Sequence, residues 1–138
     1  MDSDALVMED RRGWATACDV QQRFMRRLAP AIDAVDCSAK CRQAHELGGD
    51  CFDFVPLAES RLALAVGDAS GKGLAAALMI SNVQSSLRTA ALFTGNDGAA
   101  MLGVVNRHVY ATSLTDRYAT LFYAVLGQKD PVKWAVVS

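Results

Sequence analysis

Two short segments of the sequence combine glycine and aspartate in a way that suits a metal ion. In "GGDCFD" Asp50 follows two glycines, and in "GDASGKG" Asp68 follows Gly67. Carboxylate oxygens are preferred ligands of magnesium and manganese, and glycine lets the backbone turn close to such a site. Aspartate and glycine are also common in simple turns. The pattern alone therefore leaves a metal site and a pair of turns equally open.

Glycine and lysine in the second segment are also typical of a phosphate-binding P-loop. That motif needs four residues between its glycines and a hydroxyl residue directly after its lysine. Here three residues separate Gly67 from Gly71, and Gly73 follows Lys72 where the hydroxyl should stand. The carboxylate of Asp68 would also repel a bound phosphate. Spacing and charge together exclude a P-loop.

Apolar periodicity predicts the elements that position the two aspartates. Amphipathic helices are predicted at about residues 16–28, 73–93 and 98–113. Strands are predicted at residues 38–47, 51–57, 61–67, 117–127 and from 133 to the last residue. Residues 61–67 and 117–127 are apolar on both alternating faces, as in strands that are covered on both sides. Asp50 and Asp68 flank the ends of the strands at 51–57 and 61–67, so their side chains are expected to meet across adjacent strands.

The order of these elements predicts an α+β fold, because strands and helices occur in separate runs. Strands that are apolar on both faces suggest two sheets packed on each other, with helices outside. We expect residues 1–15 to form a flexible lead-in and residues 16–138 to form the domain. A last strand that has only just begun indicates that the chain is part of a larger domain.

The composition limits the classes of partner. Lys and Arg number 14 against 15 Asp and Glu, a net charge of −1, which excludes the basic surface of a nucleic-acid-binding protein. No apolar run approaches the roughly 18 residues of a membrane span. The acidic start "MDSDALVMED" argues against a signal peptide. We therefore expect a cytoplasmic protein whose four cysteines are free, mostly buried thiols.

Three segments of the chain resemble one known family. "CRQAHELGGDCFDF", "GDASGKGLAAALMISNVQSSLRT" and "RYATLFYAVL" are similar to the metal-dependent protein phosphatase (PPM) family, in the bacterial branch typified by stage II sporulation protein E. The resemblance begins near Val20, in the helix "VQQRFMRRLAP", and runs to the last residue. Gln43 stands where the family usually has proline.

The resemblance implies a four-layer αββα sandwich of two antiparallel sheets, with two Mn²⁺ or Mg²⁺ ions at one end. Asp50 matches the family's first metal-binding aspartate, Asp68 the aspartate that bridges both metals, and Ala69 the residue that offers a backbone carbonyl. Two close cations convert a bridging water into hydroxide and neutralise charge during in-line attack on phosphorus. No covalent enzyme intermediate is then needed.

Two further residues near these motifs each have two interpretations. Lys72, with Gly71 beside it, could contact phosphate at the start of a helix or could be an ordinary solvated lysine. Asp53 could support the site from behind its metal ligands or could cap a turn.

The C-terminal half of the family pattern is missing from this chain. Further metal-binding aspartates of the family lie there, one of them in an Asp-Gly motif. Asp97, Asp116 and Asp130 follow Asp68 here, but none stands in a matching motif, and we interpret them as a helix cap, a loop charge and a turn residue. The 138 residues are therefore expected to be an N-terminal portion that is inactive by itself.

Two functions follow from the resemblance. The first is a serine/threonine protein phosphatase in bacterial signalling, of the sigma-factor partner-switching type, with a phosphorylated protein such as an anti-sigma factor antagonist as substrate. An upstream sensor domain would control it, and a homodimer is left open. The alternative is a regulatory or binding module of the same fold that cannot hold two metals.

Overall fold

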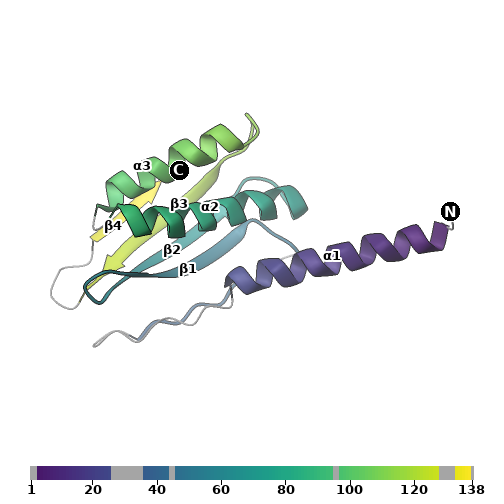
Figure 1. Cartoon of the computed structure of the whole chain (residues 1–138), viewed down its shortest axis with the longest axis horizontal. Helices are drawn as coiled ribbons and strands as arrows, with labels where there is room; N and C mark the ends of the chain where they lie inside the picture. Colours follow the sequence, from purple (N-terminus) through teal and green to yellow (C-terminus); the bar gives the residue numbers. More distant parts are fainter. Residues whose placement is uncertain (1–2, 26–35, 44–45, 95–96, 128–132, 138) are drawn as a thin grey trace.

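The computed structural model describes residues 3–25, 36–43, 46–94, 97–127 and 133–137. The elements, in chain order, are α1 (Ser3–Met25), β1 (Asp50–Leu57), β2 (Arg61–Ala69), α2 (Gly73–Phe93), α3 (Gly98–Thr112), β3 (Ala119–Leu126) and β4 (Lys133–Val137). This order confirms the predicted α+β class (Figure 1). None of the described helices is long and apolar enough to cross a lipid bilayer.

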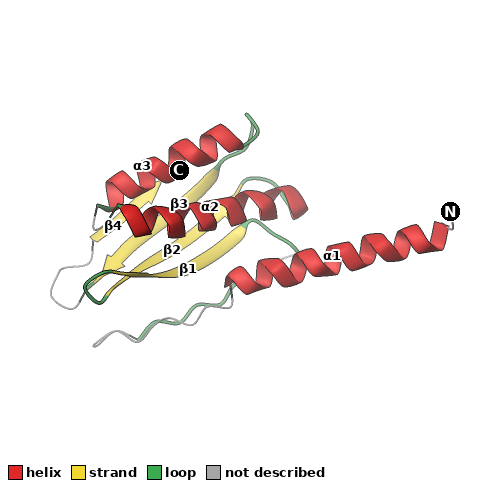
Figure 2. Cartoon of the chain, viewed as in Figure 1, coloured by secondary structure: helices red, strands yellow, loops and turns green. Residues whose placement is uncertain are grey.

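The strands form one antiparallel sheet in the order β1-β2-β3-β4. The register pairs Asp50 with Asp68 in the first ladder and Val66 with Phe122 in the second. Helices α2 and α3, which connect β2 to β3, lie together across one face of this sheet (Figure 2). Asp50 therefore lies on the edge strand β1, and Asp68 lies on its neighbour β2.

The hydrophobic core lies between this covered face and the two helices. It contains the buried residues Cys51, Val55, Ala63, Ala65, Leu121 and Tyr123 of the sheet, and Ala76, Ile80, Val83, Leu87, Met101, Leu102 and Val105 of the helices. The small side chains of β2 leave room for α2 to pack closely. A β-carbon at Gly67 would lie 3.1 Å from Leu121 Cδ1 and 3.3 Å from Cys51 Sγ, so glycine at this position lets side chains of β3 and β1 pack against β2.

The opposite face of the sheet is apolar but only partly covered. Leu62 and Ala124 on that face are buried, whereas Val66 is 56% exposed and Phe122 is 42% exposed. The second sheet of the predicted sandwich has no counterpart among the described residues. Periodicity correctly indicated that both faces are apolar, but it cannot show what covers each of them.

Helix α1 differs most from the sequence prediction. It begins at Ser3 and not at Thr16, so the expected flexible lead-in is helical from residue 3 onward. It extends away from the sheet on the β1 side (Figure 1). Its predicted end, residues 26–28, lies outside the described residues.

The segment before β1 also differs from its prediction. Residues 36–43 have no regular secondary structure and residues 46–47 form a bend, so the strand predicted at 38–47 is wrong over the described residues, and residues 44–45 lie outside them. All four cysteines are free, as predicted, but only Cys51 is fully buried, so the expectation that most of them are buried is wrong.

Candidate functional site

Asp50 and Asp68 lie directly opposite each other on β1 and β2. Directly paired residues project from the same face of an antiparallel sheet, with β-carbons about 4.5–5.5 Å apart. Both residues are exposed. The expected convergence of these two carboxylates at the ends of their strands is therefore found. Their role as metal ligands remains a prediction.

The pair lies on the face that α2 and α3 do not cover. Successive side chains of a strand alternate between faces, so Asp50 shares its face with Phe52, and Asp68 shares its face with Val66. The covered face instead carries the core residues Cys51 and Ala65. Any additional group that binds at the aspartates must therefore approach from the partly exposed apolar face.

Close backbone contact fixes the segment that leads into Asp50. The amide of Ala69 donates to the carbonyl of Gly49 at 3.1 Å, and a β-carbon at Gly49 would come within 2.6 Å of the Ala69 carbonyl oxygen. Gln21 of α1, which is buried, donates to the Gly48 carbonyl at 2.7 Å and accepts from the Gly48 amide at 3.3 Å. The two glycines before Asp50 thus permit contacts that a side chain would block.

The loop after Asp68 is held by the start of β3. The Ser70 amide donates to the Tyr118 carbonyl at 2.8 Å, and the Tyr118 amide donates to Ser70 Oγ at 3.0 Å. Arg117 Nη1 donates to the Ser70 carbonyl at 3.3 Å. Sequence reasoning missed Arg117, because nothing in "DRYATLF" singles out an arginine whose contact lies 47 residues away.

Gly71 takes a backbone conformation that few other residues adopt, with φ of +99°. A β-carbon there would also lie 2.0 Å from Arg117 Nη1. Lys72, the next residue, is exposed at the N-cap of α2. The structure leaves both interpretations of Lys72 standing, and a phosphate contact by Lys72 or Gly71 stays a prediction.

Asp53 is not part of the aspartate pair. It projects from the covered face of β1, is 2% exposed, and forms an ion pair with Arg88 of α2. The turn interpretation is wrong, since Asp53 lies within β1, whereas support of the site by Asp53 stays a prediction. Its charge instead joins β1 to α2, and the buried Gln84 adds a second link by donating to the Phe52 carbonyl at 3.1 Å.

The later aspartates do not join the pair either. Asp97 caps α3 by accepting from the Ala100 amide at 2.9 Å, which confirms the predicted helix cap. Asp116 is exposed beside Arg117, and Asp130 lies outside the described residues. Among the described residues, no three His, Cys, Asp or Glu side chains are grouped closely enough to hold a metal ion.

The donor set at the pair still suits a hard cation in part. Two carboxylates on one face, next to the carbonyl of Ala69, are the oxygen ligands that magnesium and manganese accept. Six ligands are usual for these ions, so the described residues could provide one side of such a site.

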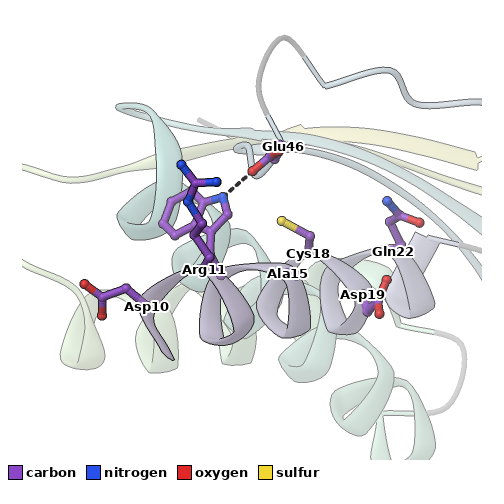
Figure 3. Close-up of a pocket in the computed structure, with 8 residues that line it drawn as sticks. Asp10, Arg11, Ala15, Cys18, Asp19, Gln22 and Glu46 are labelled. Carbon is purple, nitrogen blue, oxygen red and sulfur yellow. Dashed lines mark hydrogen bonds between the residues drawn. The ribbon is translucent and has the colours of Figure 1, made fainter. Parts of the chain in front are cut away.

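A separate groove lies between α1 and Glu46 (Figure 3). Trp14 donates its indole N–H to Glu46 at 2.5 Å, and Asp10, Arg11, Cys18 and Asp19 also line the groove. None of the residues predicted to bind metal or phosphate lines it.

Residues 58–136, more than half of the chain, match the Stage II sporulation protein E (SpoIIE) family. The chain belongs to the SpoIIE family. The SpoIIE match includes Asp68 and the loop that follows it, and the recognised PPM resemblance is thereby confirmed.

Three relatives are similar to this SpoIIE-family chain. Phosphoserine phosphatase RsbU of Bacillus subtilis is 32% identical over 108 residues, which is 78% of this chain and 32% of RsbU. Protein IcfG of Synechocystis is 26% identical over 136 residues, covering 78% of this chain and 21% of IcfG. A crystal structure of the RsbU and RsbW domains of Rv1364c from Mycobacterium tuberculosis shares 28% identity with a TM-score of 0.57, over 67% of this chain and 26% of that one. The chain spans about a third or less of each of these relatives.

Proposed function

We propose that this chain provides one side of the active site of a metal-dependent serine/threonine protein phosphatase. The observation that carries the proposal is the direct pairing of Asp50 with Asp68 on the uncovered face of the sheet. SpoIIE-family membership supports it, as does similarity to a relative named as a phosphoserine phosphatase.

Asp50, Asp68 and the carbonyl of Ala69 are the groups that would hold the metal. Bound Mn²⁺ or Mg²⁺ would supply a hydroxide nucleophile near neutral pH and would offset negative charge on the phosphoryl group. The chain's own contribution is to keep two carboxylates opposed on neighbouring strands before any ligand arrives. The contacts of Ser70 with Tyr118 and Arg117 anchor the loop that follows Asp68 and leads to Lys72.

We also propose that a second sheet covers the apolar face that carries Asp50 and Asp68, which would complete the four-layer sandwich. Val66 and Phe122 together expose a large apolar area there, and burying such side chains is favourable by about 1.5–3 kcal/mol each. Residues of that sheet would approach the aspartates from the open side and would supply the remaining metal ligands. In this proposal residues 16–138 form the N-terminal portion of the domain.

The proposed substrate is a phosphorylated protein in bacterial cytoplasmic signalling, such as an anti-sigma factor antagonist in partner switching, under the control of an upstream sensor domain. The named activity of RsbU supports this substrate class. A homodimer is compatible with the proposal and is not required by it.

The test compares residues 1–138 with the complete gene product, meaning the full translation product of the gene. The complete gene product should hydrolyse a phosphoserine peptide and p-nitrophenyl phosphate with Mn²⁺ or Mg²⁺, and EDTA should abolish the activity. Residues 1–138 alone should be nearly inactive. Equal turnover by both proteins, or turnover that survives EDTA, would contradict the proposal.

A second candidate is a regulatory or binding module of the same fold without catalysis. The observation that favours it is that the described residues bring together only two carboxylates at the site. In that case the complete gene product should bind a phosphopeptide but should not hydrolyse it at any Mn²⁺ concentration.

A further inference from the structure

Gln43 contacts the backbone of Asp50 from the segment that precedes β1. Its side-chain amide Nε2 donates to the Asp50 carbonyl at 2.7 Å and lies 3.4 Å from Cys41 Sγ, which itself lies 3.8 Å from the same carbonyl. Gln43 and Cys41 thus both contact the backbone at the start of β1.

The ladder geometry explains why the Asp50 carbonyl is available to Gln43. The Ala69 amide donates to Gly49, so these two residues form a hydrogen-bonded pair. Pairs alternate along an antiparallel ladder, and the next pair, Asp50 with Asp68, is consequently of the non-hydrogen-bonded kind. In such a pair the side chains are close and the backbone groups point away from the neighbouring strand. At Asp50 they point outward, because β1 is the edge strand.

We propose that Gln43 is a positioning residue, which holds the first residue of β1 in the ladder so that the Asp50 carboxylate stays opposite Asp68. The need for such a residue is electrostatic, since like charges directly opposite each other on a sheet are destabilising. An edge strand that begins with a repelled carboxylate would otherwise fray at that end. This inference rests on the proposed function only where it concerns metal.

Gly48 makes the contact sterically feasible. A β-carbon at Gly48 would lie 1.8 Å from Gln43 Oε1 and 2.7 Å from its Cδ. The φ of Gly48 is not in the left-handed region, so the requirement for glycine here is one of space and not of backbone conformation. Gln43 and Gly48 should therefore be energetically coupled.

Hydrogen exchange on the metal-free complete gene product tests the contact itself. Gln43→Ala should speed exchange in a peptide covering residues 48–53 by about fivefold, the factor expected for loss of one ordinary hydrogen bond. The isosteric Gln43→Glu, which keeps the shape but cannot donate when ionised, should do the same. Ser38→Ala, an exposed neutral change in the same segment, should have no effect, and a peptide from β3 should exchange as in the wild type. Wild-type exchange in Gln43→Glu would overturn the inference.

Direct Mn²⁺ binding, measured by calorimetry, separates positioning from a merely structural role. Gln43→Ala should weaken binding about tenfold, the lower end of the effect seen when a group that orients a metal ligand is removed. The rate at saturating Mn²⁺ should stay within about twofold, because the carboxylates themselves are unchanged. Faster exchange with unchanged Mn²⁺ binding would overturn the positioning role. Wild-type protein that binds Mn²⁺ and responds to Gln43→Ala, yet hydrolyses nothing, would refute the proposed function and leave this inference standing.

A double-mutant cycle tests the coupling to Gly48. Gly48→Ala should shift the urea midpoint of unfolding markedly when Gln43 is present, and should shift it less in the Gln43→Ala background, where no side chain occupies the space. Equal shifts in the two backgrounds would show that Gln43 does not occupy this position in solution.

Discussion

Asp50 and Asp68 form a directly opposed pair of carboxylates on two neighbouring strands. The hydrogen bond between Ala69 and Gly49, one position along, makes this a pair whose side chains lie close together. Two like charges so placed are unfavourable in the absence of a cation. If the pair holds metal, as proposed, stability of the metal-free fold and affinity for metal should change in opposite directions when one of the two carboxylates is replaced.

Asp68→Asn in the complete gene product tests whether turnover and stability change in opposite directions. If Asp68 bridges two metals, the amide should lower turnover on the order of a thousand-fold, since ~1.4 kcal/mol of transition-state stabilisation corresponds to one decade. The metal-free protein should unfold at the same or a higher temperature, because one repelled charge is gone. Asp36→Asn, an exposed change outside the pair, should alter neither property. Retention of more than about a tenth of the wild-type rate would exclude Asp68 as the bridging ligand.

The buried ion pair between Asp53 and Arg88 predicts that Asp53→Asn lowers stability but hardly lowers turnover, the reverse of what is expected for Asp68→Asn. Asp53→Asn should destabilise the fold by about 3 kcal/mol, because it leaves the Arg88 guanidinium without its charged partner inside the protein. Turnover per folded molecule at saturating Mn²⁺ should fall little, since Asp53 faces away from Asp50. Urea unfolding measures the first effect. A double variant with Arg88→Met should recover part of the lost stability, and no recovery would mean that the pair is not the cause.

Sequence reasoning succeeded for the elements and residues whose signal is local in the chain. The helix predicted at about 73–93 is Gly73–Phe93, and the strand predicted at 61–67 is Arg61–Ala69. These elements carry strong periodicity, and periodicity is a local property. The convergence of Asp50 with Asp68 could also be predicted, because each follows glycine at the end of a strand.

The failures concern contacts between segments that are distant in sequence. The partner of Asp53 lies 35 residues away on α2, so its role could not be deduced from a three-residue spacing to Asp50. The start of α1 was missed for a different reason. Residues 1–13 show no apolar periodicity, which is the signal from which an amphipathic helix is predicted.

The contact of Arg117 with the loop after Asp68 predicts a difference between two glycines. Gly71 and Gly73 both have positive φ, but only Gly71 would place a β-carbon against Arg117. Gly73→Ala should cost about 1 kcal/mol of stability from backbone strain alone, and Gly71→Ala should cost more. In the Arg117→Ala background the cost of Gly71→Ala should decrease, while that of Gly73→Ala should stay the same. Urea unfolding of the five variants measures these differences. An unchanged cost at Gly71 would contradict the contact.

The thiol of Cys51 predicts a loss of stability in alkaline solution. Burial, with a smaller effect of the Asp53 charge, raises its pKa from 9.0 to about 12. Above pH 9 the thiol ionises in the unfolded chain but stays protonated in the fold, so the unfolded state binds fewer protons. Stability should therefore be complete below that pH and should fall toward pH 12 by about 1.4 kcal/mol per unit.

Cys51→Ala should flatten this alkaline decline, whatever it does to stability at neutral pH. Burial also raises the pKa of Tyr123, against a smaller opposing effect of Arg61, so Tyr123→Phe serves as the comparison for a second buried acid. Urea unfolding between pH 8 and pH 11 gives the slopes. If Cys51→Ala keeps the wild-type slope while Tyr123→Phe removes it, the tyrosine and not the thiol is responsible.

The apolar face that carries Asp50 and Asp68 gives the last prediction. If a second sheet covers this face in the complete gene product, Phe122 is buried there, although it is 42% exposed in the structure. Phe122→Glu should then destabilise the complete gene product by at least about 3 kcal/mol, because a charge would replace a buried ring. In residues 1–138 alone the same change should reduce self-association, which an exposed apolar face promotes.

The control is Tyr110→Glu, at a large side chain that is 85% exposed on α3, which should have little effect on the stability of either protein. Urea unfolding of the complete product and light scattering of residues 1–138 measure the two effects. A complete product that tolerates Phe122→Glu as well as Tyr110→Glu would show that no second sheet packs on this face.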